Sequence, residues 1–148
     1  MRYAHTNIAA RDWKALADFY TRVFGCRVKP PKRELAGAWL DAATGLQGAR
    51  LEGVHLLLPG HGEHGPTLEI FTYGETLERA PQAANSAGFA HIAFEVEDVR
   101  ETFQAALAAG GKRLGEVTER DVEGVGRLTF VYFRDPEGNI VEIQSWKR

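Results

Sequence analysis

The feature that most constrains this sequence is an internal repeat, in which two segments share landmarks at one spacing. The segment that starts at His5 resembles the segment that starts at His91, which lies 86 residues later. Two further pairs keep the same spacing: Asp12 with Asp98, and Gly25 with Gly111. A chain built from two copies of one unit is expected to fold that unit twice. The repeat therefore predicts two modules of the same architecture.

Each copy begins with a strand that leads into a helix. The runs HTNIA and HIAFEV alternate apolar and other residues, as half-buried strands do. An aspartate able to cap a helix follows each run, and Glu101 lies three residues after Asp98, as in a capping box. Apolar residues then recur with helical spacing in both copies, clearly from Leu16 to Phe24 and more weakly from Phe103 to Gly110. Gly25 and Gly111 are expected to end these two helices.

The two copies also end alike, in LEIFTY (68–73) and VEIQSW (141–146). The two glutamates of these runs are 73 residues apart, so the first copy holds 13 more residues than the second. We expect this excess in the Pro- and Gly-rich region 30–65, where VHLLL (54–58) reads as a strand and PGHGEHGP (59–66) as a turn. In the second copy RLTFVYF predicts a strand, and DPEGN predicts a hairpin turn.

These patterns predict an α+β protein of two βαβββ modules. The first module is expected at 1–75, a connection at 76–87 and the second module at 88–148, together forming one domain. Each module would cover one face of its sheet with a helix and leave the other face bare. Pairing the bare faces would give a cupped mixed sheet around a cavity, which is where function is expected.

Four polar side chains are predicted to face that cavity: His5, Glu69, His91 and Glu142. Strand alternation turns each histidine away from the apolar residues of its strand, and each glutamate lies between two apolar neighbours that face the helix. Two enclosed carboxylates are costly unless a cation neutralises them, and imidazoles add neutral nitrogen ligands. The sequence therefore predicts one divalent metal ion bound by two histidines and two glutamates. Its identity among Zn, Ni, Fe, Mn and Co stays open, and an octahedral shell would leave two adjacent positions for substrate oxygens.

The segments MRYAHTNIAARDWKALADFYTRVFG, GFAHIAFEVEDV and DPEGNIVEIQSW resemble the vicinal oxygen chelate superfamily of glyoxalase I, bleomycin-resistance proteins and extradiol dioxygenases. The resemblance covers nearly the whole chain. The ligand order His, Glu, His, Glu is similar to that of glyoxalase I, the lactoylglutathione lyase. It is also close to that of methylmalonyl-CoA epimerase.

The resemblance implies a metal-dependent lyase or isomerase that transfers a proton next to a carbonyl, on a small substrate with two adjacent oxygens. A hemithioacetal of glutathione and a CoA thioester are the candidate substrates. The metal would polarise the carbonyl and stabilise an ene-diolate, while a glutamate released from the metal would carry the proton. Either Glu142 or Glu69 would be this catalytic base. Glu69 follows the loose 59–66 turn and Glu142 the tight DPEGN hairpin, so this difference favours Glu69 as the more mobile one.

Three alternatives remain open at this stage. An epimerase would use the same carboxylates as opposed acid and base. An extradiol-type dioxygenase would use three protein ligands and leave open the position that Glu69 fills. A ligand-sequestering protein of the bleomycin-resistance kind would not be an enzyme.

Other candidate residues receive no role from the sequence. His55 in VHLLL either lines the cavity or faces water at the rim of the sheet. His61 and His64, in the glycine-rich turn before Glu69, offer a second metal clamp or a lid, although a hydrated turn is the commoner case. Cys26 follows Gly25 and is more often a small buried filler than a reactive thiol.

Composition excludes several classes of partner and location. The net charge is −2, and no run of Lys or Arg could follow phosphates, so nucleic acid and membrane surfaces are not expected partners. Cys26 is the single cysteine, and the first residues lack the apolar stretch of a signal peptide, which together predict a cytoplasmic protein. A homodimer is expected, because small modules of this kind expose sheet edges that favour association.

Overall fold

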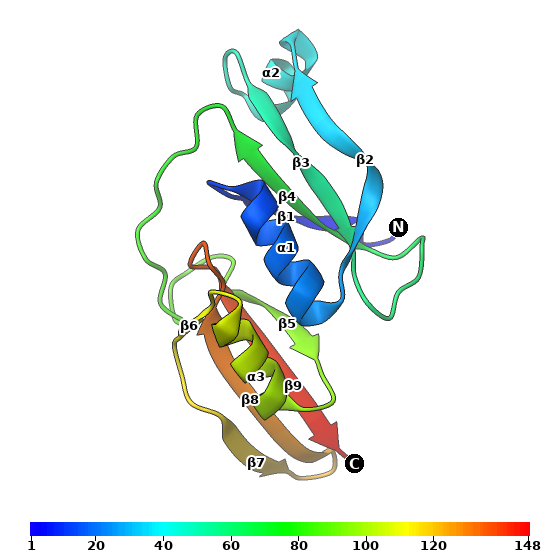
Figure 1. The fold of residues 1–148 in the computed structure, drawn as a ribbon, viewed down its shortest axis with the longest axis vertical. Helices are drawn as coiled ribbons and strands as arrows, with labels where there is room; N and C mark the ends of the chain where they lie inside the picture. The colour runs from blue at the N-terminus through cyan, green and yellow to red at the C-terminus, as the bar shows by residue number, and fades with distance from the viewer. The chain divides into compact units, whose positions relative to one another are not determined.

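Two separate mixed sheets, one in each half of the chain, carry the fold (Figure 1). The computed structural model describes residues 1–148, and these divide into two compact units, Met1–Arg79 and Ala80–Arg148. Three helices accompany sheets of four and five strands. The predicted α+β class is confirmed, as are two copies of a unit that runs strand, helix and further strands.

The first unit contains a four-stranded sheet in the order β1-β4-β3-β2. Its elements are β1 (His5–Ala9), α1 (Trp13–Phe24), β2 (Arg27–Ala36), α2 (Ala38–Thr44), β3 (Arg50–Leu57) and β4 (Thr67–Tyr73). Strand β1 runs parallel to β4, and the other neighbours are antiparallel. The predicted strand at 54–58 forms the second half of β3.

Helix α1 begins and ends where the sequence predicts. The Asp12 side chain accepts hydrogen bonds from the first-turn amides of Lys14 and Ala15, and Gly25 ends the helix in the left-handed conformation, with φ 67°. The amide of Trp13 donates to the Thr72 hydroxyl at 3.0 Å, which places α1 on the face of β4 to which Thr72 belongs. Residues of odd number on β4 therefore lie on the opposite face.

The extra length of the first copy forms part of β2 and a second helix, α2, which the sequence did not predict. Leu40 of α2 is buried in a small cluster with Ala49, Leu51 and Phe71. Seven residues are too few to show helical periodicity in a sequence, and α2 owes its place to this tertiary packing. Since Leu51 and Phe71 have odd numbers on β3 and β4, α2 packs against the face that α1 leaves bare.

The second unit contains a five-stranded sheet with the order β5-β9-β8-β6, in which β7 also pairs with β8. Its elements are β5 (His91–Glu95), α3 (Val99–Ala108), β6 (Lys112–Arg113), β7 (Thr118–Val122), β8 (Gly126–Arg134) and β9 (Ile140–Lys147). Strand β5 runs parallel to β9, as β1 runs parallel to β4. The order β5-β9-β8 therefore repeats the order β1-β4-β3.

Helix α3 is capped as α1 is, but it ends earlier than expected. Asp98 accepts hydrogen bonds from the amides of Arg100 and Glu101. The last helical residue is Ala108, whereas Gly111 was predicted to stop the helix. Gly111 instead closes the turn by donating its amide to the Ala106 carbonyl at 2.9 Å. An added Cβ there would lie 2.8 Å from that oxygen, so the glycine is needed for close approach.

The hairpin between β8 and β9 sets the register of the second sheet. Asp135 is fully buried and its carboxylate accepts from the amides of Glu137 and Asn139, which closes the DPEGN turn as predicted. Rings of Phe103 and Phe133 lie 5.9 Å apart, which places α3 on the Phe133 face of β8.

The segment between Tyr73 and His91 contains no helix or strand. None of the helices combines the length and apolar character required to cross a bilayer.

Candidate functional site

The face of the first sheet opposite α1 brings together the predicted pair His5 and Glu69. Nε2 of His5 lies 3.4 Å from Oε2 of Glu69. Glu69 lies between the buried Leu68 and Ile70, so alternation directs its carboxylate away from α1. The Glu69 side chain is nevertheless only 10% exposed. We call this pair the first half-site, and it places a largely buried carboxylate next to an imidazole.

His55, to which the sequence gave no role, contacts the same carboxylate. Register places His55 of β3 directly opposite Glu69 of β4, and its Nε2 lies 3.0 Å from Oε1 of Glu69. Asn7, opposite Glu69 on β1, donates from Nδ2 to Oε2 at 3.4 Å. Both carboxylate oxygens of Glu69 thus have partners from neighbouring strands.

The second sheet repeats this arrangement with His91 and Glu142. Nε2 of His91 lies 3.1 Å from Oε2 of Glu142, whose side chain is 13% exposed. Val141 and Ile143 on either side are fully buried, and Val141 is opposite Phe133 on the α3 face. Glu142 therefore lies on the face that α3 leaves bare.

Tyr132 is the counterpart of His55 in the second unit. It lies directly opposite Glu142 on β8, as His55 lies opposite Glu69 on β3. Its hydroxyl donates a hydrogen bond to Glu142, and its ring centroid lies 5.0 Å from that of His91. The two half-sites therefore share a histidine and a glutamate and differ in the residue on the third strand.

Electrostatics distinguish these two third-strand residues. Burial lowers the pKa of His55, and nearby Arg33 and His5 lower it further, against the opposing effect of Glu69. Burial raises the pKa of Tyr132, and Glu142 adds to the increase by repulsion and by accepting its hydrogen bond. Both shifts favour the uncharged side chain, in which Tyr132 keeps its O–H donor and His55 keeps one ring N–H donor.

The donor chemistry of the half-sites fits a divalent metal ion. Each unit pairs a largely buried carboxylate with an imidazole nitrogen, and carboxylates with imidazoles suit Zn, Fe, Mn, Ni and Co. No group of three or more His, Cys, Asp or Glu side chains is arranged to hold a metal ion. Each unit thus supplies two of the four predicted ligands, and His55 directs its Nε2 at Glu69.

The sequence contained signals for the two residues that it left without a role. His55 alternates with apolar neighbours along its strand, as Glu69 does. Its partner on β4 depends on the register between β3 and β4, which is set across a long, irregular connection. Tyr132 was more accessible to prediction. A hairpin closed at DPEGN pairs residues at equal distances on either side of Glu137, which places Tyr132 opposite Glu142.

Other candidate residues lie outside the half-sites. His61 and His64 are exposed in the turn before β4, where Glu63 forms an ion pair with Arg27 at 2.6 Å. Cys26 is fully buried, and burial raises the pKa of its thiol to about 11. A buried thiol with a raised pKa is unreactive, so Cys26 is a structural residue.

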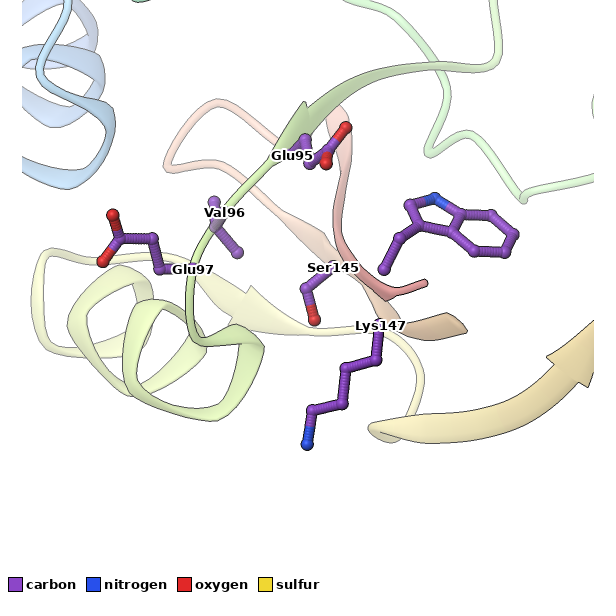
Figure 2. Close-up of a pocket in the computed structure, with 6 residues that line it drawn as sticks. Glu95, Val96, Glu97, Ser145 and Lys147 are labelled. Atoms are coloured by element: carbon purple, nitrogen blue, oxygen red, sulfur yellow. The ribbon is translucent and has the colours of Figure 1, made fainter. Parts of the chain in front are cut away.

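A shallow pocket of about 340 Å³ lies in the second unit, at the ends of β5 and β9. Figure 2 shows Glu95, Val96, Glu97, Ser145 and Lys147 around it, and Trp146 completes the lining. Neither His91 nor Glu142 lines this pocket, so it is separate from the half-site.

Comparison with known proteins gives one family. The model of the Glyoxalase/Bleomycin resistance protein/Dioxygenase superfamily matches residues 2–143, almost the whole chain. A search of curated proteins found no match.

Solved structures share the fold at low sequence identity. A glyoxalase family protein from Bacillus cereus is 18% identical, with a TM-score of 0.77 over 100% of this chain and 94% of that one. One from Enterococcus faecalis is 23% identical, with a TM-score of 0.60 over 97% of this chain and 96% of that one. A glyoxalase I variant from Zea mays is 17% identical, with a TM-score of 0.64, and 96% of this chain matches 46% of that longer one.

Proposed function

Because the chain belongs to the Glyoxalase/Bleomycin resistance protein/Dioxygenase superfamily, we propose that it is a metal-dependent lyase or isomerase that moves a proton next to a carbonyl. The observation that carries the proposal is the repeated His–Glu pair: His5 with Glu69 at 3.4 Å, and His91 with Glu142 at 3.1 Å. A structural role for one such pair would not require its repetition at matched positions of two sheets. Together the pairs supply two imidazoles and two carboxylates for one divalent metal ion.

The metal, when bound, supplies a Lewis acid for two adjacent substrate oxygens. His5 and His91 would hold the ion through their imidazoles, and Glu69 and Glu142 would neutralise its charge. One of the glutamates also acts as general base, accepting the proton on a carboxylate oxygen and returning it to the neighbouring carbon. A largely buried carboxylate suits this task, because exclusion of water strengthens its interactions with nearby charges and hydrogen-bond donors.

The proposed substrate is a small molecule with vicinal oxygens, such as a hemithioacetal. Glyoxalase I from Zea mays shares the fold, and the four-ligand set of two histidines and two glutamates supports a lyase or an isomerase over a dioxygenase, which needs an open position on its metal. An epimerisable CoA thioester is the second substrate to assay, because the same pair of carboxylates would serve it.

The first test is metal content. We expect close to one divalent ion per chain by elemental analysis after dialysis, and a metal dissociation constant more than about 100-fold higher in His91→Ala, since loss of a ligand exceeds the effect of losing a supporting residue. His64→Ala, in the exposed turn, is the matched control. Wild-type protein that binds no divalent ion would disprove the metal site, and unchanged affinity in His91→Ala would remove His91 from it.

The second test is turnover. Metal-loaded protein should convert the hemithioacetal of methylglyoxal and glutathione, or epimerise a CoA thioester. Full metal content without turnover of either substrate would instead support a ligand-sequestering protein.

We also propose that the protein is a homodimer in solution, which sedimentation measures directly.

A further inference from the structure

His55 is held at both ring nitrogens. Its Nδ1 lies 3.3 Å from the hydroxyl oxygen of Thr67, and its Nε2 lies 3.0 Å from Oε1 of Glu69. Its ring meets that of Phe71 edge to face, with centroids 5.8 Å apart. The side chain is 17% exposed. With two polar contacts and a packed ring, His55 has little rotamer freedom.

The chemistry of the partners fixes the direction of these hydrogen bonds. An ionised carboxylate can only accept, so Nε2 of His55 donates to Oε1 of Glu69. In the neutral imidazole Nδ1 is then an acceptor, and the Thr67 hydroxyl donates to it. Thr67 is itself buried, at 6% exposed. A chain of hydrogen bonds therefore runs from Thr67 through His55 to Glu69.

This chain distinguishes the two oxygens of Glu69. Oε1 accepts from His55, whereas Oε2 lies on the side of His5, 3.4 Å from its Nε2. A half-turn of the carboxylate about its last bond would only exchange two equivalent oxygens, but a quarter-turn would tilt its plane and break the contact with His55. His55 thus fixes the plane of the carboxylate, so that one oxygen accepts from His55 and the other faces His5.

We propose that His55 is a positioning residue that holds the plane of the Glu69 carboxylate with one oxygen directed toward His5, so that Glu69 serves as the fixed carboxylate ligand of the first half-site. The inference rests on the proposed metal-binding function. His55 acts through Glu69 in this role, as residues behind metal ligands commonly do. The matched Tyr132 offers Glu142 a phenolic hydroxyl instead, so the two glutamates are held differently.

The test compares four variants of the protein. His55→Phe keeps a flat ring and removes the N–H donor. His55→Gln keeps a donor, because its amide nitrogen is placed much like Nε2 of histidine. His64→Phe makes the same change as His55→Phe at an exposed histidine. His5→Ala serves as the reference for loss of a ligand.

The readouts are the Co²⁺ dissociation constant, from competition with a chromophoric chelator, the visible Co²⁺ spectrum, and the melting temperature of the metal-free protein. We expect His55→Phe to weaken Co²⁺ binding about 10- to 100-fold, and His55→Gln to remain within about 3-fold of wild type. His64→Phe should match wild type. Metal-free melting temperatures should stay close together, because the role concerns the ligand and not the core.

The possible failures can be told apart. If His5→Ala loses Co²⁺ while His55→Phe binds as wild type does, the metal site stands and the positioning role is rejected. If His55→Gln is as weak as His55→Phe, the N–H donor is not the operative group, and the role is again rejected. If the wild type binds no Co²⁺, both the proposed function and the role of His55 are overturned.

Discussion

The two half-sites are built to one plan and are completed differently. In both, a histidine at the start of the first strand meets a glutamate on the parallel strand beside it. Glu69 has His5 and Asn7 on β1 and His55 on β3 as partners, whereas Glu142 has His91 on β5 and Tyr132 on β8, and the residue opposite it on β5 is Ala93. The two copies thus share the pair of histidine and glutamate and differ in the residues around it. Two glutamates at equivalent positions can therefore differ in how firmly their side chains are held.

The difference bears on which glutamate would move the proton in the proposed reaction. The turns that precede the glutamates favour Glu69 as the mobile one, because the glycine-rich turn at 59–66 is looser than DPEGN. The side-chain contacts favour the opposite assignment, because Glu69 is restrained through both carboxylate oxygens. Substitution at the two positions decides between these arguments.

The largest expected effect is on turnover in Glu142→Gln. Glutamine still offers an oxygen to a metal but cannot accept a proton at neutral pH, so both Glu142→Gln and Glu69→Gln should keep most of the metal. At least one should lose about 100-fold or more in kcat, and we expect the larger loss in Glu142→Gln. Hemithioacetal turnover and metal content are the measurements.

The control for this pair is Glu116→Gln, at an exposed position outside the half-sites, which should keep the wild-type rate. A larger loss in Glu69→Gln would instead support Glu69 as the base, as the looser turn at 59–66 suggests. Wild-type rates in both variants would leave the lyase reading without a base.

A smaller effect, on metal affinity, is expected when Tyr132 is substituted. Tyr132→Phe removes the hydroxyl that donates to Glu142 and leaves the ring beside His91. We expect metal affinity to fall about 10-fold, at the low end for a residue behind a ligand, because the contact between His91 and Glu142 remains. Chelator competition measures it, with Tyr73→Phe as the control. A loss greater than that in His91→Ala would mean that Tyr132 binds the metal directly.

The smallest effect concerns the helix caps, where the two units should behave alike. Asp12→Ala and Asp98→Ala each remove a carboxylate that accepts from two first-turn amides, and each should cost about 1 kcal/mol in the free energy of unfolding. Asp12→Asn and Asp98→Asn should restore most of it. Urea denaturation gives the values, and a cost near zero in one unit would show that its helix is held by packing alone.

Much of the fold could be predicted because its signals are local or repeated. Asp12 and Gly25 bound α1 through contacts within a few residues, and the apolar spacing from Leu16 to Phe24 identifies its buried face. The shared landmarks of the two copies added information that one copy lacks, since a weak pattern in the second helix gained support from the first. The end of α3 was misplaced because Gly110 and Gly111 both serve the turn, through φ 100° in one and close approach in the other.

The sequence by itself determined the two modules, the helix caps and the pairing of a histidine with a glutamate in each, because strand alternation and repetition act along the chain. Only the tertiary structure decided that α2 forms and that His55 contacts Glu69. These depend on register between strands and on burial of Leu40 and Phe71, which are set by packing between segments distant in sequence. Local preference cannot encode such contacts, because their free energy appears only when the sheet has formed.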